Sequence, residues 1–444
     1  MKRKTVLVGG AGSAALAFLG SACSGEETGG PATLTFWHGY TEADGDVLQG
    51  IVDEFNASQA DITVNTEVKT WASIDDTLLT ALSAGEGPDI VAMPAERLPV
   101  YADKGAFVEL TSFYADDSSN TANLIPGAVA MIEVEGTKYG VPTGFVPLAV
   151  YYNTALFEAG GVTEFPATWD EWVATAKQLT VDEDGDGTPE QYGVVLPDHA
   201  TVANGLWPSL FYGNGGDIVS EEIDAVIDSP ENAATLEYWR SAIVDDKISP
   251  TGIDGVGADE LFGAGKAAMT IGGPWMASIA AENGIDCAIA AIPAGPAAQA
   301  ASAIGVSMAV TMDANDNARA AAEKFFAFFL NDENAAAWSL GSGWPPLRTD
   351  VPAEAVNSNP VVASLTEIAD LGRPLLPGVV NSVDVLAAVD ELTQRAIAGD
   401  DIDGRSPMPR GPSRTRSSRP AGTTSEQDRQ AGAPTSAPPP HQGE

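Results

Sequence analysis

Cysteine and histidine are both scarce in this 444-residue sequence. The two cysteines are Cys23 and Cys287, and a bond between them would join the extreme N-terminus to the interior. A framework of several disulfide bonds is therefore excluded. Three histidines are present, and the last, His441, lies in an atypical C-terminal segment. A zinc centre built from cysteine and histidine consequently lacks ligands.

Basic side chains are also few, because 22 Lys and Arg stand against 62 Asp and Glu. Residues 24–404 hold 13 of the basic and 59 of the acidic side chains, which leaves that segment with a net charge of −46. Such a body repels the phosphates of nucleic acids, so a nucleic-acid partner is excluded. By charge alone it would also dock poorly on an anionic lipid surface.

Long apolar runs are confined to the N-terminus, so we expect no transmembrane helix elsewhere. Residues 1–23 read as a lipoprotein signal peptide, with three basic residues at 2–4 and an apolar stretch at 6–19. Small residues then precede Cys23, as in the lipobox of bacterial lipoproteins, although Gly20 stands where leucine is usual. We expect lipid attachment at Cys23 and a polar linker over residues 24–32. The alternative is an ordinary cleaved signal with an incidental cysteine.

Strand and helix patterns alternate through most of the remaining sequence. Residues 33–37 and 62–68 have strand-like patterns, and Val47, Ile51 and Phe55 form a helical stripe between them. This alternation predicts α/β layers with mostly parallel strands. Residues 405–444 contain no Leu, Ile, Val, Phe, Trp or Tyr, so we expect that segment to be a disordered tail.

One acidic loop has the spacing of a calcium ligand set. Asp182, Asp184 and Asp186 occupy positions 1, 3 and 5, and Gly187 occupies position 6, as in the first half of a calcium loop. Position 12 is Gly193 instead of a bidentate glutamate. The sequence thus leaves two alternatives, a structural calcium site or a solvated turn. No other cofactor is indicated, since the P-loop, nucleophile-elbow and zincin signatures are all missing.

Tryptophans at strand ends and in turns rich in Gly and Pro are the remaining candidates for ligand binding. Trp37, Trp71, Trp207, Trp275 and Trp344 lie in such places, whereas the other tryptophans sit on predicted helices and are expected in the core. Aromatic faces pack against the C–H faces of sugars, and carboxylates accept hydrogen bonds from hydroxyls. An acidic, exported protein with these residues suits a neutral polyol.

A series of short motifs follows one order between residues 33 and 403. They are Leu34-Thr-Phe-Trp-His38, Phe55-Asn56, Gly87-Pro88-Asp89-Ile90, Val150-Tyr-Tyr-Asn153, Pro166-Ala-Thr-Trp169-Asp-Glu-Trp172, Gly265-Lys-Ala-Ala-Met269, Gly273-Pro-Trp275 and Gly343-Trp-Pro345. In this order and spacing the sequence resembles the family 1 extracellular solute-binding proteins of bacterial carbohydrate ABC importers.

The resemblance implies an α/β fold of the type II periplasmic-binding-protein kind, in which two lobes, each an α/β sandwich, are joined by hinge segments. It assigns residues 33–144 and 293–312 to lobe 1, and residues 145–292 and 313–404 to lobe 2. The chain is expected to cross between the lobes near residues 141–146, 289–293 and 311–315. The ligand would be held in the cleft between the lobes.

The resemblance also implies which residues contact the ligand. His38 and Tyr40 lie on the first strand-to-helix loop, and Glu96 and Arg97 replace an Asp-Arg pair of maltose-type members. Trp207 and Trp275 match aromatic cleft positions of the family, and the turn around Trp344 suggests a similar role for that residue.

The implied function is that of a non-catalytic, monomeric component that captures a sugar and delivers it to the membrane permease of an ABC importer. Its place would be the outer face of the bacterial cytoplasmic membrane, held there by a lipid anchor. A glycerol-phosphate-type ligand is an alternative within the family, disfavoured by the shortage of cationic side chains. An exported glycoside hydrolase is the alternative from another class of protein.

The charge distribution predicts that the folded protein becomes more stable as ionic strength rises, because salt screens the repulsion among acidic side chains. The melting temperature should therefore increase over a series of monovalent salt concentrations. A melting temperature that salt leaves unchanged or lowers would contradict this expectation.

Overall fold

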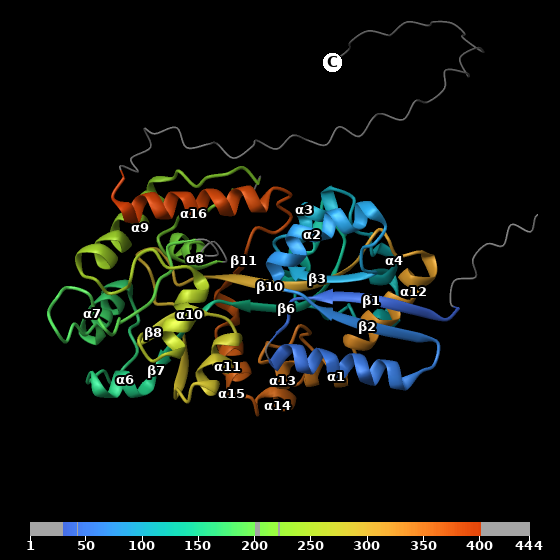
Figure 1. The fold of residues 1–444 in the computed structure, drawn as a ribbon, viewed down its shortest axis with the longest axis horizontal. Coiled ribbons are helices and arrows are strands. Elements are labelled where there is room, and N and C mark those ends of the chain that lie inside the picture. Colours follow the sequence, from blue (N-terminus) through green and yellow to red (C-terminus); the bar gives the residue numbers. More distant parts are fainter. Residues whose placement is uncertain (1–29, 42, 200–204, 221–222, 401–444) are drawn as a thin grey trace, which may run out of the picture.

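The computed structural model describes residues 30–41, 43–199, 205–220 and 223–400. These residues form two α/β lobes that lie side by side along the long axis of the molecule (Figure 1). The two-lobed α/β fold expected from the sequence is thereby confirmed. The predicted signal peptide with Cys23 and the predicted tail of residues 405–444 lie outside the described residues.

Lobe 1 is built on a mixed sheet whose strands follow the order β11-β10-β3-β1-β2, with β6 paired to β10. Strand β1 runs parallel to β2 and β3, whereas β10 runs antiparallel to β3 and β6. The expectation of mostly parallel strands is therefore correct for only part of this sheet. Its strands are β1 (Ala32–His38), β2 (Ile62–Val68), β3 (Ile90–Pro94), β6 (Val141–Pro147), β10 (Ala301–Val310) and β11 (Gly372–Pro374).

Helices cover both faces of this sheet, which is why every residue of β3 except Pro94 is buried. Helix α2 begins after Thr70, whose side chain accepts a hydrogen bond from the Ser73 N–H, and ends at Gly85 in the left-handed conformation. The elements on lobe 1 are α1 (Ala43–Ser58), α2 (Trp71–Ala84), α3 (Leu98–Asp103), α4 (Thr111–Ala115), α5 (Pro126–Met131), the hairpin β4 (Glu133–Val134) and β5 (Thr137–Lys138), α12 (Asp316–Phe329), α13 (Asp332–Ser342) and α14 (Ala353–Val356).

Helices α12 and α13 pack on lobe 1, although the sequence analysis placed residues 313–404 in lobe 2. The fully buried ring of Phe325 lies edge-on to Phe36 of β1 and Phe55 of α1, with ring centroids 6.1 and 5.3 Å apart. The aromatic face of α12 is thus buried against the apolar faces of β1 and α1. Burial of these large rings decides which lobe the segment joins.

Lobe 2 contains a smaller sheet in which β7 (Ala149–Asn153) is paired antiparallel with both β8 (Met269–Gly272) and β9 (Cys287–Ala291). The prediction of mostly parallel strands is wrong for this sheet. Its core includes the three helical tryptophans Trp169, Trp172 and Trp239, whose rings meet at 5.0–5.3 Å. The helices of this half are α6 (Thr154–Ala159), α7 (Trp169–Leu179), α8 (Leu206–Gly213), α9 (Pro230–Arg240), α10 (Gly255–Gly263), α11 (Trp275–Glu282) and α15 (Pro360–Glu367).

The chain passes between the lobes where β6 leads into β7 and where it returns along β10. The expected third crossing near residues 311–315 does not occur, because Thr311 and Asp313 are hydrogen-bonded to Pro88 and Gly87 of lobe 1. The chain instead leaves lobe 1 after α14 and reaches α15, which contacts β9, and it then rejoins the sheet of lobe 1 at β11. Helix α16 (Ser382–Ala398) then lies across the molecule, touching α3 of lobe 1 and α9 of lobe 2 (Figure 1).

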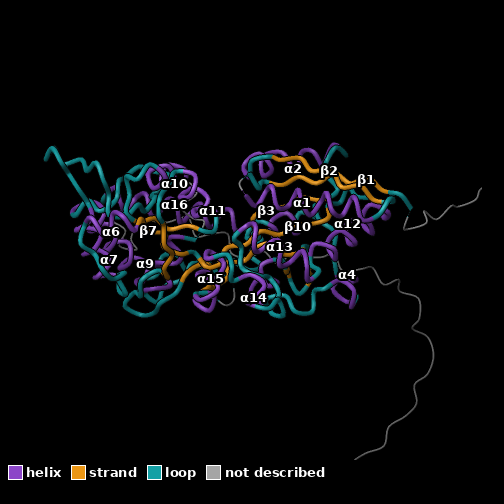
Figure 2. The backbone as a smooth tube through the Cα atoms, turned by 90° about the horizontal axis from the view of Figure 1, so that it is seen from below, coloured by secondary structure: helices purple, strands orange, loops and turns teal. Residues whose placement is uncertain are grey.

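Viewed from below, the elements of the two lobes separate clearly. Helices α9, α10 and α11 lie on one side and α1, α2 and α12 on the other, with β10, α13 and α15 near the middle (Figure 2). Within the ranges that the structure describes, no helix is both long enough and apolar enough to cross a membrane.

Candidate functional site

A cavity of about 510 Å³ lies between the two lobes, and both contribute to its walls. Lobe 1 supplies the loop after β1, the start of α2 and the residues that follow β3. Lobe 2 supplies α10, the end of β8 and the start of α11. The lining residues are Gly39, Tyr40, Thr41, Asp44, Trp71, Pro94, Glu96, Leu148, Pro197, Leu206, Gly255, Val256, Ala258, Asp259, Ile271, Gly272, Trp275, Ile279, Ile304, Gly305, Val306 and Trp344.

The wall of lobe 1 is placed by the carboxyl ends of three neighbouring strands. Tyr40 follows β1, Trp71 follows β2 and Glu96 follows β3. Because these strands are parallel, their carboxyl ends meet at one edge of the sheet, where open α/β sheets place ligands. Local sequence thus sets each residue at a strand end, and strand order brings the three residues together.

The three tryptophans of the cavity are each seated against a glycine. A Cβ added to Gly39 would overlap the Trp71 ring, and one added to Gly144 would overlap the Trp344 ring. A Cβ added to Gly273 would likewise overlap the indole of Trp275, two residues further along the chain. Only glycine allows such close approach of a ring to the backbone. The indoles are therefore held in defined positions around the cavity.

Tyr40 is held by contacts at both ends of its ring. Its hydroxyl lies 2.5 Å from the Thr143 hydroxyl, and its ring meets Trp71 edge-on with centroids 5.3 Å apart. On the opposite side it meets Trp338, whose indole N–H donates to the Thr143 carbonyl at 2.7 Å. Tyr40 is therefore a rigid part of the cavity wall.

The charged side chains among the described lining residues are all acidic: Asp44, Glu96 and Asp259. Burial raises the pKa of Glu96 to about 7. Burial also raises the pKa of Asp259 to about 7, and the hydrogen bond that it accepts from the Trp275 indole opposes this shift. At neutral pH both carboxyl groups are therefore poised between the protonated and the ionised form.

The structure brings together four of the seven residues that the sequence analysis proposed for the site. Tyr40, Glu96, Trp275 and Trp344 line the cavity. His38 does not, because its ring is buried beneath Tyr40, where burial lowers its pKa to about 4. Within the described chain, neither ring nitrogen of His38 has a hydrogen-bond partner.

Arg97 and Trp207 also lie away from the cavity surface. The guanidinium of Arg97 forms its ion pair with Asp75 of α2, and burial lowers its pKa. Trp207 is fully buried in lobe 2, and its indole N–H donates to the Pro197 carbonyl at 3.0 Å. Its neighbour Leu206 reaches the cavity instead. In α8 the helical turn directs these adjacent side chains to different surroundings.

Sequence reasoning did not select Asp44 or Asp259, and it named Trp71 among the candidate tryptophans without including it in the implied ligand contacts. Trp71 carried a usable signal, because it stands at a strand end like the tryptophans that were selected. Asp44 and Asp259 carried none, since they are two acids among the 59 of residues 24–404.

The acidic loop places three carboxylates close together, but they are not the three expected. Oxygens of Asp182, Asp184 and Glu190 lie within 4.8 Å of one another. Asp186 is outside this group, and its carboxylate accepts a hydrogen bond from the Thr188 N–H. With one oxygen from each residue, the three exposed carboxylates supply three of the six to eight oxygens that calcium takes, so water would have to complete the shell.

Gly193 explains why this loop has no glutamate at position 12. A Cβ at this residue would overlap the backbone carbonyl of Ala176 in α7. Any side chain here would push the loop away from the helix. Calcium binding therefore stays a prediction, with Glu190 in place of Asp186, and an ion there would have a structural role away from the cavity.

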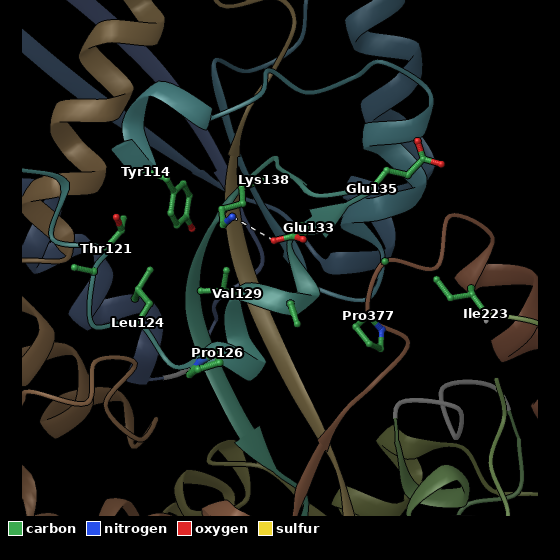
Figure 3. Close-up of a pocket in the computed structure, with 13 residues that line it drawn as sticks. Tyr114, Thr121, Leu124, Pro126, Val129, Glu133, Glu135, Lys138, Ile223 and Pro377 are labelled. Atoms are coloured by element: carbon green, nitrogen blue, oxygen red, sulfur yellow. Dashed lines mark ion pairs between the residues drawn. The ribbon is translucent and has the colours of Figure 1, made fainter. Parts of the chain in front are cut away.

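A second cavity, of about 550 Å³, is lined mainly by lobe 1, with Ile223 contributed by the segment between α8 and α9 of lobe 2 (Figure 3). Its Lys138 ammonium is paired with Glu133 at 3.2 Å and lies 5.5 Å from the Tyr114 ring centroid. Tyr114 is the aromatic residue among its described lining residues, and the lysine is already neutralised. The cavity between the lobes, with its aromatic walls and buried carboxyl groups, is therefore the better candidate for a ligand site.

Residues 50–364 match the family of bacterial extracellular solute-binding proteins. The chain belongs to this family. Among curated relatives, a putative binding protein of Brucella abortus is 25% identical over 347 residues, covering 76% of this chain and 82% of the relative. A diacetylchitobiose binding protein of Streptomyces coelicolor is 26% identical over 293 residues, covering 62% and 64%. A maltotriose-binding protein of Pyrococcus abyssi is 25% identical over 264 residues, covering 60% and 54%.

Solved structures of other solute-binding proteins share the fold. One from Thermotoga lettingae, bound with α-D-tagatose, has a TM-score of 0.74 at 22% identity and covers 84% of this chain and 96% of its own. A maltose/maltodextrin-binding domain from Bdellovibrio bacteriovorus, bound to maltotriose, has a TM-score of 0.72 at 20% identity, with coverage of 83% and 94%. These likenesses establish the type II fold of this solute-binding protein.

The raised pKa of Glu96 predicts how stability depends on pH. Between its ordinary pKa of 4.5 and its folded pKa of about 7, the folded state holds more protons than the unfolded state. The free energy of unfolding should therefore fall as pH rises through this window, with a contribution from Glu96 on the order of 1–3 kcal/mol. Glu96→Gln should flatten the fall, as measured by urea unfolding at several pH values.

Glu237→Gln, at an exposed position of α9, is the matched control and should leave the pH dependence of the wild type intact. An equally steep fall in the Glu96→Gln variant would show that Glu96 does not titrate in this window.

Proposed function

We propose that this protein captures a sugar or oligosaccharide in the cavity between its lobes and delivers it to the membrane permease of an ABC importer. The observation that carries the proposal is the cavity itself, in which Tyr40, Trp71, Trp275 and Trp344 surround carboxyl groups from both lobes. Rigid aromatic faces suit the C–H faces of a sugar ring, and the carboxyl groups suit its hydroxyls. The function is non-catalytic, and the protein acts as a monomer.

Closure of the lobes over the ligand is the working step of this proposal. The walls belong to different lobes, and the connecting segments at Leu148 and Ile304 line the cavity floor. A ligand that contacts both walls stabilises the closed arrangement, because it forms its full set of contacts only there. The permease would then recognise the closed form.

Names of the relatives support a carbohydrate ligand. A maltotriose-binding protein and a diacetylchitobiose binding protein are among the curated relatives, and solved structures of the same fold hold tagatose and maltotriose. A phosphorylated ligand such as glycerol phosphate is disfavoured, because the described lining residues include no lysine, arginine or histidine.

A glycoside hydrolase is the second candidate, favoured by one observation. Glu96 and Asp259 both line the cavity and both have a pKa of about 7, a value suited to a general acid. Incubation with oligosaccharides separates the two functions, since hydrolysis products would identify an enzyme. Stoichiometric binding without products would identify the transport component.

Membership of an extracellular family means that the protein is exported. We infer further that Cys23 is acylated and holds the protein at the outer face of the cytoplasmic membrane, on the strength of the basic, apolar and small-residue segments that precede it. A lipid anchor keeps the binding protein close to the permease that it serves.

Trp275→Ala should weaken sugar binding by on the order of 1–3 kcal/mol, as truncation of an aromatic anchor usually does. Its effect on stability should be smaller than the roughly 3–5 kcal/mol of a core substitution, because the indole is only half-buried. Trp207→Ala, the matched control in the core, should show the opposite pattern. Titration calorimetry and urea unfolding of both variants provide the two measurements. A destabilised Trp275→Ala variant with normal affinity would refute the assignment.

Cys23→Ser should release the protein from the membrane, because serine offers no thiol for acylation. Fractionation of cells and metabolic labelling with palmitate measure the effect. Cys287→Ser, which alters the half-buried cysteine of β9, is the control and should stay labelled in the membrane fraction. Membrane association that survives in Cys23→Ser would contradict the anchor.

A further inference from the structure

The cavity between the lobes offers many hydrogen-bond acceptors and few free donors. Its charged lining residues in the described chain are Asp44, Glu96 and Asp259, and the lining contains no Lys, Arg, His, Asn or Gln. Ionised carboxylates accept hydrogen bonds and cannot donate them. Side-chain donors are limited to the hydroxyls of Tyr40 and Thr41 and to three indoles.

Some of these donors are already engaged. The Tyr40 hydroxyl is 2.5 Å from the Thr143 hydroxyl, and the Trp275 indole N–H donates to Asp259. The side chains of this lining therefore favour a ligand that donates hydrogen bonds. A sugar hydroxyl both donates and accepts, whereas an ammonium group has three donors and no acceptor.

No lysine, arginine or histidine is among the described residues that line the cavity. Glu96 is 4% exposed, and its nearest cation, Arg97, has its Nε atom 3.8 Å away. Arg97 lies outside the lining and is shared between Asp75, its closer partner, and Glu96. Burial makes the ionised forms of Glu96 and Asp259 unfavourable, and both pKa values are raised for this reason. A cationic ligand would relieve this cost.

The aromatic walls favour the same kind of ligand. Tyr40, Trp71, Trp275 and Trp344 present ring systems whose negative faces attract cations, best when water is excluded. A bare metal ion is a poor alternative. In the described chain, the three carboxylates whose oxygens lie within 4.8 Å of one another belong to the loop at Asp182, away from the cavity. The cavity acids are therefore too dispersed to share one ion.

We propose that the ligand is an amino sugar with at least one free, protonated amine, bound between the aromatic walls and the carboxylates Asp44, Glu96 and Asp259. This inference rests on the proposed sugar-binding function and narrows it. Acids on both walls allow the charged ligand to draw the lobes together, since Asp44 and Glu96 belong to lobe 1 and Asp259 to lobe 2.

Matched sugars test the proposal by titration calorimetry. Each set shares one carbon skeleton and differs only at C2 of each ring: glucosamine, N-acetylglucosamine and glucose; galactosamine, N-acetylgalactosamine and galactose; chitobiose, diacetylchitobiose and cellobiose. In the set that binds, the free amine should bind at least about tenfold more tightly than both counterparts, the size expected for a charge-assisted contact. This preference should shrink as salt is added, because salt screens charge.

Asp259→Asn should reduce the ratio of amine affinity to hydroxyl affinity by about tenfold, because the amide keeps the shape but loses the charge. Glu260→Gln is the matched control. It removes one charge at an exposed position of the same helix, outside the cavity lining, so the ratio should not change.

The outcomes separate this inference from the proposed function. Equal or tighter binding of the uncharged or N-acetylated counterparts would overturn the amino-sugar assignment and leave sugar binding in place. If the amine binds more tightly but neither Asp259→Asn nor Glu96→Gln changes the ratio of amine affinity to hydroxyl affinity, the role of these carboxylates is overturned. Failure of every sugar in all three sets to bind would overturn the inference, and failure of maltotriose and tagatose as well would overturn the proposed function.

Discussion

The antiparallel pairing of β6 with β10 is the constraint on which the rest of the structure depends. The two strands pair from Val141 to Pro147, and each continues into a connection between the lobes. The pair therefore belongs to the sheet of lobe 1 and also supports the floor of the cavity. A shift in its register would move the walls of both lobes relative to each other.

Small residues in this ladder hold the aromatic wall in place. Thr143 contacts the Tyr40 hydroxyl with its side chain and accepts the Trp338 N–H with its carbonyl. Gly144, the next residue, leaves the space that the Trp344 ring occupies, and its own carbonyl lies so close to Gly305 that a Cβ there would be 2.8 Å away. The paired strands β6 and β10 thus position two of the rings that line the cavity, those of Tyr40 and Trp344.

The acidity of the cavity follows from the same architecture. Glu96 is buried because it lies two residues after β3, at the edge where the three parallel strands end. Its carbonyl also accepts the Ser382 hydroxyl of α16 at 2.6 Å, which links the site to the helix that spans both lobes. Desolvation raises the pKa of a carboxyl group in such a place, and its ionisation responds strongly to the charge of a ligand that enters the cavity.

The sequence by itself determined the α/β class, the helical tryptophans of the core and the strand-end position of Tyr40, Glu96 and Trp275, because these depend on local periodicity and turn chemistry. Only the tertiary structure decided that α12 joins lobe 1, that Trp207 faces the core and that Asp259 meets Trp275. These outcomes depend on which apolar faces find each other and on contacts between residues far apart in the chain. A hydrophobic pattern shows that a face will be buried, but not against which partner.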